Sequence, residues 1–232
     1  MMQRGSSGQL ARVGGVPLAL IAAAVSVPAI AAASALSATQ VVERVQQRFA
    51  ACESLAARFE KQFVWAALER TSTRHGKIYL QRPDRFRVEL DDGSLLVADG
   101  QAIWSYSSRN QQAVVSAYHG DVQTPWEVLT DYRSRYLPVA VEEAALGKHA
   151  CYLLTLRPQS PSSTVSQMRV WVDRGQWHPR RVEQRETSGN VTTYTLTEIR
   201  TDQRLDEELF RFHAPAGTQI IDSRPQAEPD VQ

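Results

Sequence analysis

Residues 85–90 read Arg-Phe-Arg-Val-Glu-Leu, so that charged and apolar side chains alternate at every position. Because successive side chains of a strand point to opposite faces, this period of two predicts a strand with one buried and one wet face. Similar patterns predict strands at residues 57–65, 76–81, 95–98, 102–106, 113–117, 151–156, 166–172, 180–186 and 191–199, with short ones near 210–213 and 218–221.

Short turn sequences separate most of these strands, among them Asp91-Asp92-Gly93 and Ser188-Gly189-Asn190. About ten strands joined in this way form an antiparallel meander, and a meander of that length must curl into a barrel or half-barrel. Such a barrel is either filled by its own side chains or holds a small apolar ligand.

Two amphipathic helices are predicted beside the sheet. The first covers about residues 38–52, because Ser37 and Gln40 form a capping box and apolar residues follow at helical spacing. The second covers about residues 125–135, since Thr124 and Pro125 suit a helix start. The polar segment 223–232 contains two prolines and is expected to be disordered.

Residues 1–35 have the pattern of a signal peptide. Arg4 and Arg12 precede an apolar run at 16–30, and small residues then occupy the positions before a cleavage site after Ala35 or slightly earlier. A membrane anchor would need about 20 apolar residues, more than this run provides. Without residues 1–35 the chain has 24 basic and 25 acidic residues, a balance that argues against nucleic-acid binding.

Cys52 and Cys151 are the only two cysteines. In an oxidising compartment they are candidates for one disulfide that closes a long loop, and the alternative is two buried free thiols. Neither has a second cysteine or histidine at metal-ligand spacing, so no metal site is expected.

Known catalytic motifs are missing from the sequence. The five histidines are scattered, and the chain contains no H-E-x-x-H, G-x-S-x-G or P-loop motif. The acid pairs Asp91-Asp92 and Glu142-Glu143 are expected to be solvated near turns. Residues far apart in the sequence can still assemble a catalytic triad, but the patterns favour a protein that is not an enzyme and needs no cofactor.

Three stretches point to a family: residues 55–62 (LAARFEKQ), 76–87 (GKIYLQRPDRFR) and 95–106 (LLVADGQAIWSY). Their order resembles the periplasmic outer-membrane lipoprotein carrier family, LolA. There a helix precedes F-x-Q or F-x-x-Q, then G-x-[LI]-x-[LVY]-x-R-P-x-x-[FL], then D-G-x-x-[LIV]-W-x-Y. The resemblance extends from Ser37 to about Asp222, and its last two motifs are specific only in tandem.

The resemblance implies a mainly β, α+β fold: an unclosed antiparallel β-barrel whose apolar cavity is covered by the N-terminal helix and a mid-chain helical lid. It implies that Arg82 hydrogen-bonds toward the lid and that Phe86 lies beside the cavity. The other candidates for cargo binding and the lid are Phe63, Trp104, Trp126 and Leu129. Strand parity adds Met168 and Leu154 as possible cavity-lining residues, although a register error of one residue would move them outside.

The resemblance further implies a periplasmic, monomeric carrier of lipoproteins with two partners. These are an inner-membrane ATP-driven complex that loads the carrier and an outer-membrane receptor that unloads it. A related sensor that regulates a membrane protease is the alternative, and the length of the chain argues against the extra C-terminal domain of such sensors. A hydrolytic enzyme and a β-domain with a filled core are less favoured alternatives.

Overall fold

The computed structural model describes residues 36–118 and 135–225, which lie within one compact unit, Leu36–Gln232. It contains one α-helix, α1 (Ala38–Ala50), and two short 3-10 helices, η1 (Ala66–Leu68) and η2 (Glu207–Phe210). The strands are β1 (Ser54–Trp65), β2 (Arg70–Gln81), β3 (Arg85–Leu90), β4 (Leu95–Asp99), β5 (Ala102–Ser107), β6 (Gln112–Ala117), β7 (Tyr136–Leu146), β8 (His149–Pro158), β9 (Val165–Asp173), β10 (Pro179–Glu186), β11 (Val191–Thr201) and β12 (Gln219–Asp222). The expected signal peptide at 1–35 and most of the expected tail lie outside the described residues.

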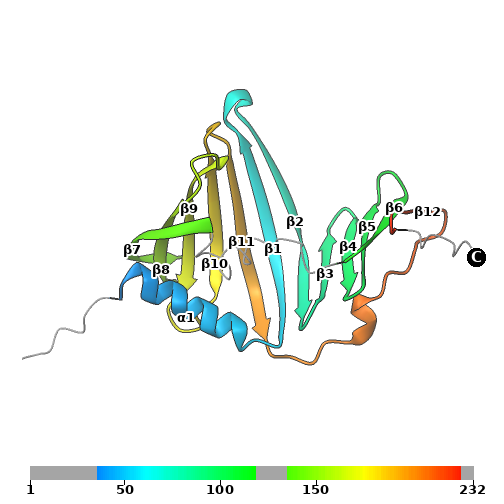
Figure 1. Ribbon diagram of the computed structural model, residues 1–232, viewed down its shortest axis with the longest axis horizontal. Helices are drawn as coiled ribbons and strands as arrows, with labels where there is room; N and C mark the ends of the chain where they lie inside the picture. Colours follow the sequence, from blue (N-terminus) through cyan, green and yellow to red (C-terminus); the bar gives the residue numbers. More distant parts are fainter. Residues whose placement is uncertain (1–35, 119–134, 226–232) are drawn as a thin grey trace, which may run out of the picture. The chain divides into compact units, whose positions relative to one another are not determined.

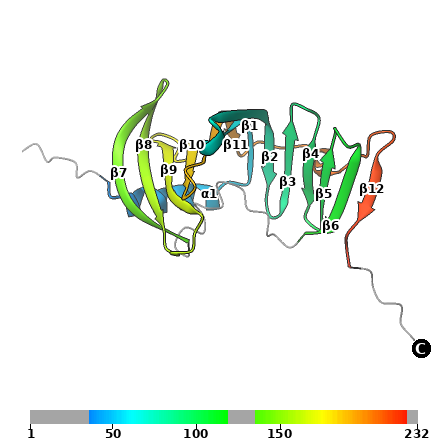
Figure 2. The ribbon, with the colours of Figure 1, turned by 90° about the horizontal axis from the view of Figure 1, so that it is seen from above.

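All twelve strands belong to one sheet, in the order β12-β6-β5-β4-β3-β2-β1-β11-β10-β9-β8-β7. The two antiparallel runs β1–β6 and β7–β11 join where β1 pairs with β11, and β12 adds to β6 in parallel. Figures 1 and 2 show β7 and β12 at opposite ends of the sheet. Over residues 36–118 and 135–225 the fold is therefore mainly β with one α-helix, and the sheet is not closed into a barrel.

Helix α1 confirms the first helix prediction. The Ser37 side chain accepts a hydrogen bond from the Gln40 backbone, and the Gln40 side chain accepts one from the Ser37 backbone. Val41, Val42 and Val45 are almost fully buried in a core with residues of β7 to β10. Burying each valine contributes about 1.5–3 kcal/mol, which is enough to hold a short helix that is marginal alone.

We call the sheet face on which α1 packs the inner face. Leu154, Met168, Val170 and Val182 form it beneath α1. Through cross-strand pairs the same face continues to Tyr194 on β11 and then across β1, β2 and β3. On this part of the inner face a second buried cluster consists of Cys52, Leu55, Ala57, Ile78 and Leu196.

The opposite, outer face of β3 to β5 is covered by the segment that follows β11. Phe210 of η2 is 1% exposed, and the Arg87 guanidinium donates a hydrogen bond to the Leu209 carbonyl oxygen. The ring of Phe212 stacks on Trp104 with 4.9 Å between centroids. The prediction of a strand near 210–213 was therefore wrong, because these aromatic residues anchor an irregular segment to the sheet rather than extend it.

Strand β7 is a second correction, since the sequence did not predict it. The predicted helix ended at about residue 135 and Glu142-Glu143 were expected near a turn, yet the strand begins directly at Tyr136 and contains both glutamates. β7 forms one edge of the sheet, and Pro138 lies beside an irregularity in its pairing with β8. Edge strands tolerate proline and lack the regular alternation that identifies half-buried strands.

Candidate functional site

The pairing register places the predicted aromatic residues on two different faces of the sheet. Phe86 on β3 pairs with Ala98 on β4 and with Leu80 on β2, and Leu80 in turn pairs with Leu55 on β1. Phe63 is eight residues after Leu55 on β1, and residues separated by an even number point to the same face of a strand. Phe63 and Phe86 therefore share the inner face. Trp104 pairs with Val97, the neighbour of Ala98, and so lies on the outer face against Phe212. Trp104 and Phe86 cannot line one surface of the sheet.

A cavity of about 240 Å³ lies next to Phe86 at the C-terminal end of α1. Its apolar walls come from Phe49, Leu55, Leu80, Phe86 and Tyr118. Phe86 is 4% exposed, and its ring meets that of Tyr118 edge to face at 5.8 Å. Phe49 and Tyr118 were not singled out for this role, although Phe49 belongs to the apolar stripe of the predicted helix.

Arg82 connects the end of β2 to the end of α1. Its Nε donates a hydrogen bond to the Cys52 carbonyl oxygen and one Nη donates to the Phe49 carbonyl oxygen, each at 2.9 Å. The guanidinium also lies over the Phe49 ring, 5.5 Å from its centroid. Because the last carbonyls of a helix have no partner within it, a cation at this position satisfies them and complements the helix dipole.

A second, polar hollow of about 890 Å³ adjoins the cavity. The two share Glu53, Ser54, Gln81 and Arg82 in their walls, and residues 202–207 complete the polar one. An apolar pocket and a polar hollow thus meet at Arg82.

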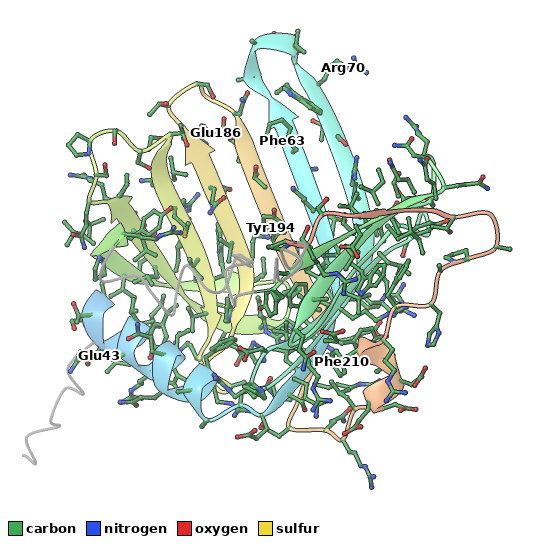
Figure 3. All side chains as sticks on the ribbon, turned by 45° about the vertical axis from the view of Figure 1, so that its right-hand side comes forward. Glu43, Phe63, Arg70, Glu186, Tyr194 and Phe210 are labelled. Atoms are coloured by element: carbon green, nitrogen blue, oxygen red, sulfur yellow. The ribbon has the colours of Figure 1, made fainter. Side chains whose placement is uncertain are left out.

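Beyond the cavity, the inner face carries further apolar side chains that are only half-buried. Phe59 and Phe63 on β1 and Tyr194 on β11 form one such group, and Val88 and Leu96 extend it along β3 and β4. Figure 3 shows Phe63 and Tyr194 on the neighbouring strands β1 and β11. The described residues therefore leave a surface of partly covered aromatic and aliphatic side chains beside the cavity.

Cys52 and Cys151 are free thiols, so the disulfide alternative is wrong. The strands β11, β10 and β9 separate β1, which follows Cys52, from β8, which contains Cys151. Four strand spacings amount to about 19 Å along the sheet, far beyond the roughly 7 Å limit between bridged Cα atoms. Burial raises the pKa of both thiols, which favours their unreactive protonated form.

The most buried ionic group lies at the turn between β9 and β10 and has no catalytic motif around it. The Asp173 carboxylate accepts a hydrogen bond from Arg180 at 2.6 Å. Burial alone would raise the pKa of Asp173, but the bonds from Arg180 and two backbone N–H groups outweigh it and lower this pKa. Among the described residues no three His, Cys, Asp or Glu side chains are arranged to hold a metal ion.

The predicted lid residues Trp126 and Leu129, with most of the helix expected at 125–135, lie outside the described residues. The described hydrogen bonds of Arg82 go to Phe49 of α1 and to Cys52 just after it, and its expected contact with the lid stays a prediction. Within residues 36–118 and 135–225, no helix is long and apolar enough to cross a membrane.

Comparison with known proteins identifies the family. The model of the family "Outer membrane lipoprotein carrier protein LolA" matches residues 50–213. An outer-membrane lipoprotein carrier protein of Legionella pneumophila (strain Lens) is 28% identical over 183 residues, which cover 77% of this chain and 88% of that protein. The carrier of Histophilus somni (strain 129Pt) is 26% identical over 187 residues, with coverages of 79% and 88%.

Among solved structures, an uncharacterized conserved protein from Thermus thermophilus has the same fold. It superposes with a TM-score of 0.54 at 17% identity, over 80% of this chain and 98% of that one. The family match covers more than half of the chain and includes both tandem motifs, with Arg82 and Phe86. The chain therefore belongs to the LolA family of outer-membrane lipoprotein carrier proteins, whose members are carriers and not enzymes.

Proposed function

We propose that this protein is a periplasmic carrier that receives lipoproteins released from the inner membrane and delivers them to the outer membrane. Residues 1–35 would direct its export and be removed. The observation that carries the proposal is the cavity beside Phe86, together with the half-buried apolar side chains that lie on the same face of the sheet. Such a surface suits acyl chains, which must be shielded from water during transit.

The size of the cavity indicates how an acyl chain is held. At about 240 Å³ it is smaller than the roughly 300–1,000 Å³ of typical ligand sites. A long acyl chain therefore extends from Phe86 across the inner face toward Phe59 and Phe63. Transfer of about fifteen methylenes from water contributes on the order of 10 kcal/mol per chain.

A carrier that binds its cargo this strongly must also release it. We assign this role to Arg82, whose contacts with the C-terminal turn of α1 hold the entrance closed in the free protein. Opening costs these hydrogen bonds and offsets part of the binding free energy, so that the closed state favours release. The helix expected at 125–135, with Trp126 and Leu129, would be the second part of this bistable element.

Two partners complete the proposal. An inner-membrane ATP-driven complex would load the carrier, and an outer-membrane lipoprotein receptor would accept the cargo. The polar hollow beside Arg82 would face the peptide part of the lipoprotein while its acyl chains occupy the inner face. The carrier itself would act as a monomer.

Release of lipoproteins from spheroplasts tests the proposal. Purified residues 36–232 should bring outer-membrane lipoproteins into the soluble fraction as complexes with the carrier. The variant Arg82→Leu should load cargo but transfer it poorly to outer membranes, whereas Arg157→Leu, a change of an exposed arginine on β8, should behave as the unmodified protein. No release, together with no binding of an apolar fluorescent probe, would overturn the carrier function.

A further inference from the structure

The tip of the β1–β2 hairpin exposes apolar side chains to solvent. Leu68 of η1 is 62% exposed and Trp65 at the end of β1 is 39% exposed. The Trp65 ring packs edge to face on Phe63, with 4.5 Å between centroids. Apolar side chains therefore reach the outermost part of the hairpin, where Leu68 of η1 lies beyond the strand residues proposed to bind acyl chains.

Basic side chains accompany this apolar tip. Arg70 pairs with Trp65 across the hairpin and stands beside the tip in Figure 3, and the exposed Arg74 pairs with Lys61 on the same face. Residues 54–81 carry five basic and two acidic side chains, a net charge of +3. Since residues 36–232 have a net charge of −1, the rest of this unit carries −4.

The neighbouring turn supports the tip in a defined position. The Ala66 backbone N–H donates a hydrogen bond at 3.1 Å to Oδ1 of Asn190, whose own amide donates to Glu186. A Cβ added at Gly189 would lie 3.3 Å from the Ala66 Cβ. The exposed apolar residues are thus presented on a braced hairpin and not on an isolated loop.

We propose that this hairpin tip binds the interface of an anionic lipid bilayer, with Trp65 and Leu68 at the acyl boundary and Arg70 and Arg74 at the phosphates. Tryptophan favours the membrane–water interface, and basic residues are attracted to anionic head groups. The net positive charge lies on the hairpin and the rest of the unit is acidic. Attraction of the hairpin to anionic head groups and repulsion of the rest would orient the hairpin toward the membrane. The proposal goes beyond the carrier function, since it concerns a surface separate from the cavity at Phe86.

Flotation with lipid vesicles tests it. The probes are phosphatidylcholine vesicles with and without phosphatidylglycerol, and the protein is the unit Leu36–Gln232, which contains the whole sheet and its core. Leu68→Ser should lower binding about ten-fold. Its matched control Leu137→Ser, which removes a leucine that is 51% exposed on β7, should leave binding unchanged.

The charge contribution has its own pair of variants. Arg70→Gln should lower binding to the anionic vesicles about five-fold and leave binding to neutral vesicles unchanged, whereas Arg157→Gln should affect neither. Circular dichroism melting would confirm that all four variants are folded. No binding to anionic vesicles, or an equal loss in Leu68→Ser and Leu137→Ser, would overturn the proposal.

The spheroplast assay separates this proposal from the carrier function. Leu68→Ser should still take up lipoproteins, because Leu68 lies outside the cavity walls. Uptake without vesicle binding by the unmodified protein would overturn the membrane contact alone. Vesicle binding without uptake would support the membrane contact and overturn only the carrier function.

Discussion

Replacing Arg82 with leucine would remove the described contacts between its side chain and α1. The bond to the Cys52 carbonyl oxygen is partly buried and the bond to the Phe49 carbonyl oxygen is exposed. Bonds to charged donors contribute about 1.5–3 kcal/mol when shielded, so about 1 kcal/mol each is appropriate for these. The contact of the guanidinium with the Phe49 ring adds roughly 0.5 kcal/mol at an exposed site.

The expected loss is therefore about 2.5 kcal/mol, which corresponds to a roughly seventy-fold larger population in which this end of α1 is undocked. Hydrogen exchange of the amides at 47–52 should accelerate by about that factor in the variant Arg82→Leu. The melting temperature should fall by about 5–10 °C, as expected for a domain of this size. Unchanged exchange at 47–52, with Arg157→Leu as the control, would refute the assignment of Arg82 to holding this end of the helix.

Three further changes test the structure elsewhere. An alanine at Gly76 would place its Cβ against the Glu89 carbonyl oxygen, so Gly76→Ala should lower the free energy of unfolding by at least about 1–3 kcal/mol in a urea titration. Phe212→Ala should free Trp104 from its stacking partner, and its fluorescence should shift to the red, whereas an unchanged spectrum would contradict this packing. Burial lowers the pKa of His178 below its usual value of about 6.5, so the unfolded state binds a proton more readily than the folded one. Stability should then fall as the pH drops from about 6.5 toward the lowered pKa, and His178→Gln should flatten that part of the melting profile. An unchanged profile in the variant would contradict the role of His178.

The strands that alternate in charge and hydrophobicity were predicted closely. Residues 85–90 form β3 with the predicted bounds, and the helix begins at Ala38 as its capping box requires. The polar first half of β2 and the edge strand β7, which begins with an unbroken apolar run at 136–141, were missed, since neither alternates apolar and polar residues. Local patterns identify strands that have one buried face, but they do not identify strands that are held mainly by backbone pairing.

The candidate site was predictable only in part. The tandem motifs indicated Arg82 and Phe86, which lie together at the cavity. The sequence did not indicate that Trp104 faces the other side of the sheet, because the face of a residue depends on pairing register and a shift of one position reverses it. The pattern of the C-terminal segment predicted a strand near 210–213 and did not indicate that its aromatic side chains cover Trp104 on the outer face.

The pairing of β1 with β11 has a consequence for how the chain folds. Strands β1 to β6 each pair with a sequence neighbour and can form hairpin by hairpin, whereas the second edge of β1 must wait for β11 from the far end of the domain. Helix α1 also packs late, because the residues that bury its valines belong to β7 to β10. Contacts of such long sequence separation form slowly. If the chain is exported N-terminus first, as we propose, the apolar stripe of α1 stays uncovered until most of the domain has crossed the membrane, and a chaperone would then protect it from aggregation.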